Sequence, residues 1–260
     1  MKKEKSANRV LKTFLEYSIS IAMFIVIWQI YIVVCGVESF MLPSPASVFK
    51  KLGEVVVEGE IWGHFAITTG EVLLGFFIGS ILGIILGYVI GKSQLLKDAL
   101  MPYLIFIQTA PKIALVPLFV IWFGLGLTSK IVLIVSMVLF PVMAGTMVGI
   151  GSIPKEMKNL MKIINASKLQ TIIKMELPAA TPMIFSGLKI GIVQAIIGAI
   201  VAEWMSGKQG LGYILTYASS VFDTELLIAG IIFTIMLGII FYEIIDILER
   251  KLLYWHESQQ

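Results

Sequence analysis

The sequence predicts an all-α integral membrane protein with six membrane-spanning helices. Hydrophobic residues make up 58% of the 260 residues, charged residues make up only 14%, and the mean hydropathy is +0.93. This balance excludes a soluble globular domain of the same length. The net charge of +3 is spread over the flanks of apolar runs, so a nucleic-acid-binding surface is excluded as well. We therefore expect one transmembrane domain over residues 1–260, embedded in a lipid bilayer.

Apolar runs of about 20 residues, the length of a helix that crosses a bilayer, recur along the chain. The runs lie at about 18–37, 66–90, 100–123, 131–150, 183–201 and 226–248. A basic arm precedes the first run, but no small-residue cleavage site follows it, so we expect an uncleaved helix and not a signal peptide. Between the first two runs, the LPSP sequence at 42–45 precedes a candidate amphipathic helix from Ala46 to about Val57.

Small residues recur at every fourth position in two of the predicted spans. The second span carries Gly75, Gly79, Gly83, Gly87 and Gly91, and the fifth carries Gly187, Gly191, Ala195 and Ala199. Such stripes allow helices to approach closely, so they predict helix packing. Because four residues overshoot one helical turn by about 40°, we expect the stripe of the second span to meet different neighbours at its two ends.

The third predicted span combines helix-breaking and polar residues. It contains Pro102, Pro111 and Pro117 together with Gln108, Thr109 and Lys112, and the fifth span contains Gln194. The prolines predict a kinked or broken helix. A lysine near the middle of a span costs about 3 kcal/mol, so we expect Lys112 and the three other polar side chains to line a path for a solute. The alternatives are a lysine that snorkels to an interface and amides that hydrogen-bond neighbouring helices.

The distribution of basic residues predicts the orientation. Fourteen Lys and Arg residues lie on the side of both termini and of the 152–182 loop, and four lie on the other side. Both termini and the loop are therefore expected to be cytoplasmic. Glu71 and Glu203 fall near the outer ends of spans, where pairing or water would stabilise them, and Lys189 is expected to snorkel.

The 152–182 loop, which carries five lysines, predicts two short amphipathic helices. The apolar positions are Met157, Leu160, Met161 and Ile164 in the first helix and Leu169, Ile172, Ile173 and Leu177 in the second. Ser167 and Gln170 have the spacing of a capping box, and Pro178 is expected to stop the second helix. Asn165 lies at the reversal, where positive φ is needed. The alternative is an ordinary basic loop on anionic lipid.

These features together resemble a known family. The loop between the fourth and fifth of six spans, with Asn159-Leu160-Met161, Asn165-Ala166-Ser167 and Met175-Glu176-Leu177-Pro178, resembles the EAA loop of ABC importer permeases, the binding-protein-dependent inner-membrane component family. The family has Glu at the position of Asn159 and Gly at that of Asn165. LPSP at 42–45, APKIALVPLFVIWFGLG at 110–126, GLKIG at 187–191, AEW at 202–204 and GLGY at 210–213 resemble its nitrate, sulfonate and taurine branch.

The resemblance implies a type I ABC importer permease in a bacterial-type inner membrane. It implies a homodimer with a second permease copy, two cytoplasmic ATPase subunits that bind ATP and Mg, and an external solute-binding protein. The chain itself would hold no cofactor and catalyse no reaction. Contact with the ATPase would fall to Asn159, Asn165, Ala166, Ser167, Leu169, Gln170, Ile172, Ile173, Leu177 and Pro178.

The resemblance leaves the cargo open between a small anion and a pyrimidine-type vitamin precursor. A secondary transporter is the rival class, but the sequence shows neither internal repeats nor a carboxylate at mid-membrane depth. His64 and His256 are solitary, so we expect them to make local hydrogen bonds and not to bind a metal.

Overall fold

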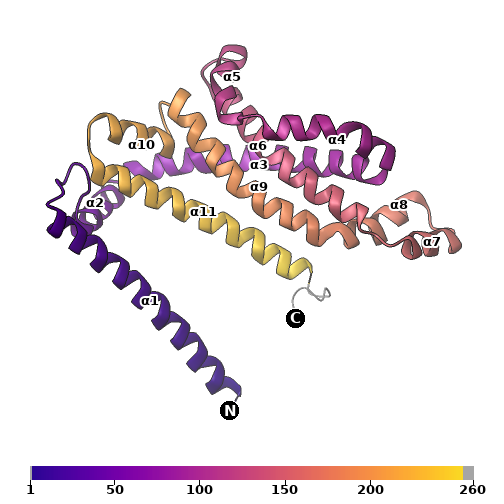
Figure 1. The fold of residues 1–260 in the computed structure, drawn as a ribbon, viewed down its shortest axis with the longest axis horizontal. Coiled ribbons are helices and arrows are strands. Elements are labelled where there is room, and N and C mark those ends of the chain that lie inside the picture. Colours follow the sequence, from indigo (N-terminus) through magenta and orange to yellow (C-terminus); the bar gives the residue numbers. More distant parts are fainter. Residues whose placement is uncertain (1, 254–260) are drawn as a thin grey trace. The chain divides into compact units, whose positions relative to one another are not determined.

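The computed structural model describes residues 2–253, and within that range the chain forms helices and turns with no strand (Figure 1). The chain divides into two compact units. The N-terminal unit contains the residues up to Ile61 together with Leu215–Ile231, and the core unit contains Trp62–Ile214 and the chain from Ile232 onward. Helices α10 (Leu211–Ser220) and α11 (Thr224–Leu252) contribute residues to both units.

The N-terminal unit contains α1 (Lys2–Cys35) and α2 (Pro45–Glu58). The Ser44 hydroxyl caps α2 by accepting the Ser47 N–H at 3.1 Å, so the expected amphipathic helix is confirmed. Lys51 of α2 forms an ion pair with Asp223 at 3.2 Å. Burial alone would lower the pKa of Lys51, but the hydrogen bond and charge of Asp223, together with the charges of Glu54 and Glu225, raise that pKa above its ordinary value.

The core unit is built on three long helices, α3 (Glu60–Lys92), α6 (Leu127–Gly151) and α9 (Leu177–Ser206). Helices α6 and α9 run side by side (Figure 1). Their backbones approach so closely that a Cβ on Gly187 would lie 2.7 Å from the carbonyl oxygen of Pro141. Only glycine fits there without moving the α6 backbone.

The glycine stripe of α3 lies against a single neighbour. A Cβ at any of its positions would lie within about 3 Å of α6 atoms, for example 2.4 Å from Ile134 at Gly75 and 2.5 Å from the Met143 carbonyl oxygen at Gly87. The expected change of neighbour along the stripe is therefore wrong. A row of residues four apart is inclined to its helix axis, and a partner helix that crosses at a matching angle follows the row along its whole length.

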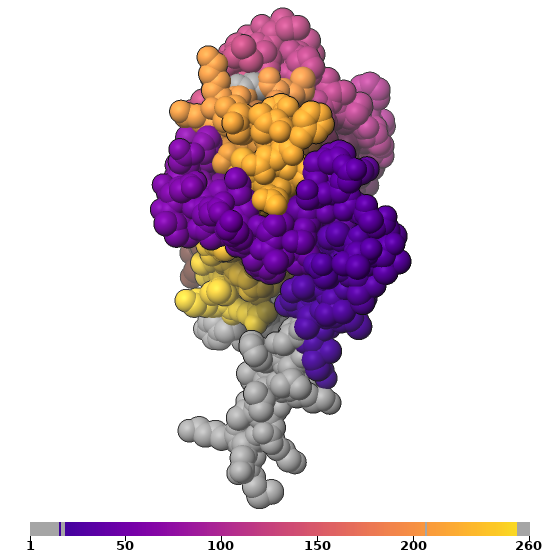
Figure 2. Space-filling view, turned by 90° about the vertical axis from the view of Figure 1, so that its left-hand side faces the viewer, coloured from indigo at the N-terminus to yellow at the C-terminus, as the bar shows by residue number. Residues whose placement is uncertain are grey.

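The third predicted span is broken, as its prolines predict. Helix α4 (Gln94–Thr109) is followed by a 3₁₀ turn η1 (Lys112–Leu115) and by α5 (Val116–Phe123), and the two arms are bent by 78°. The break falls at Ala110 and Pro111. Val116 and Phe119 of α5 pack in a buried cluster with α6 and with Val201 of α9, and Figure 2 shows the pink α5 region lying against the orange end of α9.

The 152–182 loop forms α7 (Lys155–Ile163) and α8 (Lys168–Thr171), followed by a π-helical turn η2 (Ile172–Glu176) that runs directly into α9. Pro178 therefore does not stop a helix, and that expectation is wrong. It is the second residue of α9 and directly follows the π-helical turn. The Leu177 N–H there already bonds five residues back to Ile172, so the regular α-helical ladder is interrupted next to the residue that lacks an N–H donor. Helix α10, in the connection between the fifth and sixth spans, was not predicted.

Length and composition identify the spans among residues 2–253. Four helices are long and apolar enough to cross a membrane: α3, α6, the continuous helix Lys168–Met205 and α11. The bent pair of α4 with η1 and α5 counts as a fifth. The first predicted span, 18–37, falls on the Ile19–Cys35 section of α1, which is apolar but shorter.

Candidate functional site

A cavity of about 400 Å³ opens beside the break between α4 and η1. Its wall consists of Gln108, Ala110, Pro111, Lys112, Ile113, Met137, Phe140, Pro141, Ile190 and Gln194. The broken third span thus supplies half of the lining, and α6 and α9 supply the rest. The residues Met137, Phe140 and Pro141 of α6 were not predicted, although a proline inside the fourth span was a signal that could have indicated them.

The polar groups of the cavity are one lysine and two amides. Lys112 is half-buried, and its Nζ donates to the Gln108 carbonyl oxygen at 3.2 Å, at the C-terminal end of α4. Gln194 is half-buried on α9, on a different wall. Thr109, which was predicted with them, does not border the cavity; its hydroxyl donates to the Phe106 carbonyl oxygen at 3.1 Å. The cavity can therefore offer one positive charge and two amide groups to a solute.

A second hollow, of about 350 Å³, shares Ile190 and Gln194 with the first and is also bordered by Lys189 and Tyr242. Lys189, which was expected to snorkel, pairs with two carboxylates of a neighbouring helix. Its Nζ lies 2.5 Å from Asp246 Oδ1 of α11 and also forms an ion pair with Glu249. Burial of a lysine is offset by pairing with carboxylates on a neighbouring helix, and no sequence pattern within α9 could indicate partners so distant along the chain.

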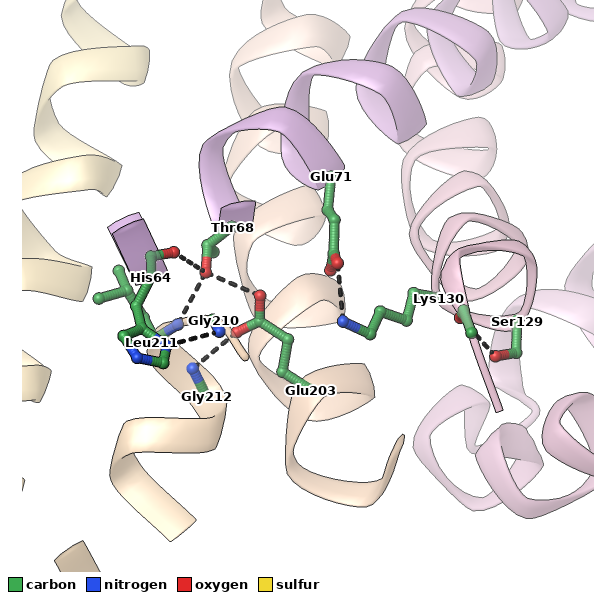
Figure 3. Close-up of polar contacts among 10 residues, drawn as sticks. His64, Thr68, Glu71, Ser129, Lys130, Glu203, Gly210, Leu211 and Gly212 are labelled. Atoms are coloured by element: carbon green, nitrogen blue, oxygen red, sulfur yellow. Dashed lines mark hydrogen bonds and ion pairs between the residues drawn. The ribbon is translucent and has the colours of Figure 1, made fainter. Parts of the chain in front are cut away.

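Glu71 and Glu203 are both buried and both paired (Figure 3). Lys130 Nζ of α6 donates to Glu71 Oε1 at 2.7 Å. Glu203 accepts the Thr68 hydroxyl at 2.7 Å and the Gly212 N–H at 2.6 Å. These ties connect α3, α6 and α9 at the end of α9 farthest from Leu177.

The same network fixes the start of α10. The Gly210 N–H donates to His64 Nδ1 at 2.9 Å, and the Leu211 N–H donates to Thr68 Oγ1 at 2.8 Å (Figure 3). Gly210 has φ 109°, and a Cβ there would lie 2.1 Å from Glu203 Oε1, so only glycine is accommodated. His64 thus makes a local hydrogen bond, as expected, whereas His256 lies outside the described residues.

Helices α7 and α8 are joined by a tight reversal at Asn165, whose φ of 52° is positive as predicted. Both hydrogen bonds of the Ser167–Gln170 capping box are present, at 3.2 and 2.8 Å. Asn159 is exposed and Ala166 is half-buried. Large apolar side chains of the loop are exposed: Leu160 56%, Ile163 77%, Ile164 60%, Leu169 65% and Ile173 55%. Exposed apolar side chains at this density fit a surface that binds another protein or lies on the membrane.

Residues 79–254, which include the broken span, the α7–α8 loop and α9, match the binding-protein-dependent transport system inner membrane component family. The chain belongs to this family. It is therefore a permease of an ABC importer. Some of its relatives are named as permeases for aliphatic sulfonates, taurine or nitrate, so the chain resembles the nitrate, sulfonate and taurine branch of the family.

Curated relatives match this permease over almost its whole length. The riboflavin transport system permease protein RibX of Chloroflexus aurantiacus is 34% identical over 92% of this chain and 90% of the relative. The formylaminopyrimidine transport permease protein ThiX of Halalkalibacterium halodurans is 31% identical over 94% and 97%. The nitrate import permease protein NrtB of Synechocystis sp. is 30% identical over 89% and 86%.

A solved structure shows the same fold. The chain in the inward-facing MetNI methionine ABC transporter matches this permease with a TM-score of 0.60 at 18% identity, over 74% of this chain and 94% of the other. The type I importer permease fold expected from the sequence is thus confirmed.

Proposed function

We propose that this permease moves a small anion of the nitrate, sulfonate or taurine kind into the cytoplasm. The observation that carries the proposal is the cavity at the broken span, where Lys112 stands with Gln108 and Gln194. A positive charge at this depth lowers the free energy of an anion in transit, because coulombic attraction is stronger where the dielectric constant is low. The two amides can donate hydrogen bonds to its oxygens.

The energy for transport comes from separate subunits in this proposal. An external binding protein delivers the solute, a second permease copy completes the path, and two ATPase subunits bind ATP and Mg. The exposed apolar side chains of α7 and α8 support a docking surface for an ATPase subunit. The permease catalyses no reaction itself.

The orientation follows from the basic residues. The termini and the α7–α8 loop are cytoplasmic, and the membrane is the inner membrane of a bacterial-type cell. The excess of Lys and Arg on that side supports this assignment. The Glu71–Lys130 and Glu203 network then belongs to the outer half of the permease.

A second candidate cargo is a neutral ring compound such as a pyrimidine-type vitamin precursor. The riboflavin and formylaminopyrimidine names of two relatives favour it. In that case the amides of Gln108 and Gln194 would carry recognition, and Lys112 would contribute only a hydrogen bond.

The test is uptake into liposomes that contain the permease with its ATPase and binding protein. Nitrate, taurine, an alkanesulfonate, riboflavin and formylaminopyrimidine are supplied separately, with ATP inside. ATP-dependent uptake of nitrate, taurine or the alkanesulfonate supports the proposal, because each carries an anionic group. Uptake of riboflavin or formylaminopyrimidine alone supports the second candidate, and uptake without ATP contradicts the importer assignment itself.

A further inference from the structure

Glu176, the last residue of the π-helical turn η2, is buried among polar partners on another helix. Glu176 is only 5% exposed. The Tyr88 hydroxyl donates to Glu176 Oε2 at 2.6 Å, and Lys92 Nζ reaches the same oxygen at 3.1 Å and Tyr88 Oη at 2.7 Å. Separating a buried carboxylate from two such partners has a high free-energy cost, because the charge would be left buried and unpaired. The cluster therefore ties η2 to the end of α3.

Glu176 and Lys92 connect this cluster to two different parts of the permease, the α7–α8 loop and helix α4. From Glu176 the chain runs back through η2, which carries the exposed Ile173, into α8, which carries the exposed Leu169. Lys92 is the last residue of α3, and the next residue, Ser93, caps α4 by accepting the Leu96 N–H at 3.3 Å. Near its other end α4 carries Gln108, which borders the cavity. The ion pair thus joins the α7–α8 loop to the end of α3, one residue before the cap of α4, and α4 supplies Gln108 to the cavity wall.

The π-helical turn differs from an α-helical turn by one residue in the register of its hydrogen bonds. The Leu177 N–H donates to the Ile172 carbonyl oxygen, five residues back, in place of the α-helical partner. Conversion of this turn to α-helical hydrogen bonding would shift the register by one residue and rotate the preceding segment relative to Glu176 by about 100°. The neighbouring Met175 is anchored in a buried cluster with Ile150, Ile153 and Ala180, so α8 rather than α9 would turn.

We propose that Glu176 is a positioning residue that transmits movement of the α7–α8 loop, through Lys92 and Tyr88, to α4 and the cavity wall. The inference rests on the proposed function in one respect, which is that the loop receives the ATPase subunit. Breaking the tie leaves the docking surface intact but uncouples the cavity from it. A merely structural role would instead reduce the amount of assembled complex.

The experiment uses the permease assembled with its ATPase and binding protein in lipid nanodiscs. In a Cys35→Ser background, Gln108→Cys reports the accessibility of the cavity through its rate of reaction with a small aqueous thiol reagent. The rate is measured with and without a non-hydrolysable ATP analogue. We expect the nucleotide to change the rate at least fivefold in the parent and less than twofold in Glu176→Ala, with equal recovery of the ATPase.

Glu156→Ala is the matched control, because it removes an exposed carboxylate from the same loop and is expected to keep the fivefold change. Lys92→Ala alters the tie from the other side, at a side chain that is 49% exposed, and is expected to lose the change as well. If Glu176→Ala does not assemble, Lys92→Ala tests the proposed role of the Glu176–Lys92 ion pair in its place. An unchanged response in the assembled variants overturns the role of Glu176, whereas failure of the parent to bind the ATPase overturns the proposed function.

Discussion

At the scale of single residues, the break between α4 and η1 determines the position of the Lys112 side chain. In a continuous helix it would extend toward lipid or a neighbouring helix, but after Pro111 the chain turns and the side chain borders a cavity with Gln108 and Gln194. Its Nζ also donates to the end of α4, at 3.2 Å from the Gln108 carbonyl oxygen. The lysine can therefore stabilise the break and attract an anion at the same time.

Replacement of Lys112 by methionine separates these two roles. We expect Lys112→Met to lower the maximal rate of uptake of an anionic solute about tenfold, the effect of about 1.4 kcal/mol on the barrier. The concentration for half-maximal uptake is expected to stay nearly constant, because the binding protein sets it. Uptake is divided by the amount of assembled complex, and Lys208→Met, at an exposed position, serves as control. Unchanged uptake per complex would show that Lys112 takes no part in transport.

At the scale of elements, the α3–α6 contact depends on glycine at positions where a methyl group has no room. A Cβ on Gly87 would lie 2.5 Å from the Met143 carbonyl oxygen and 2.7 Å from Thr146 Cβ, whereas a Cβ on Gly70 of the same helix would meet nothing within 4 Å. Backbone atoms cannot rotate away as a side chain can. The same substitution should thus have opposite effects at the two positions.

We expect Gly87→Ala to destabilise the permease by about 1–3 kcal/mol, the usual cost of overpacking. Gly70→Ala should be neutral or slightly stabilising, because alanine favours a helix over glycine. The measurement is the midpoint of thermal unfolding in detergent for the two variants and the parent. Equal midpoints for Gly87→Ala and Gly70→Ala would contradict the close contact with α6.

The α7–α8 loop offers a test of docking. We expect the double substitution Ile172→Asp and Ile173→Asp to abolish co-purification of the ATPase, because it places two charges in an apolar contact. The spans should stay folded, since Ile173 is 55% exposed and Ile172 is half-buried. Lys174→Asp introduces a carboxylate at the next position without removing an apolar side chain, and is expected to retain the ATPase. Normal co-purification of the double variant would refute the docking surface.

Local features of these elements could be predicted from the sequence, whereas features set by packing could not. The capping box of Ser167, the positive φ of Asn165 and the break at Pro111 each follow from neighbouring residues. The partners of Lys189 do not, because they lie on α11, which is distant along the chain. The buried role of Glu176 was missed for the same reason.

At the scale of the whole molecule, the cavity belongs to a permease that we propose to act as a homodimer. One copy supplies a wall from the broken span, α6 and α9, and a second copy would close the path on the open side. The sequence predicted the chemistry of this path from polar residues at membrane depth. It could not predict which of them share the cavity, since that depends on how the chain bends after Thr109.

The path predicts a graded pattern of accessibility. Single cysteines at Gln108, Lys112 and Gln194, in a Cys35→Ser background, should react with small aqueous thiol reagents, because all three positions border the cavity. Cysteine at Thr109 should react at least tenfold more slowly, because this exposed position does not border the cavity and a thiol that faces lipid stays protonated and out of reach of aqueous reagents. The rates are measured in assembled transporter, with a cysteine at the buried position Ala195 as the unreactive control. Protection of all four positions would contradict a water-accessible path, and equal reaction of all four would place Thr109 in it. Protection that appears only when two permease copies are joined would show that the second copy covers this wall.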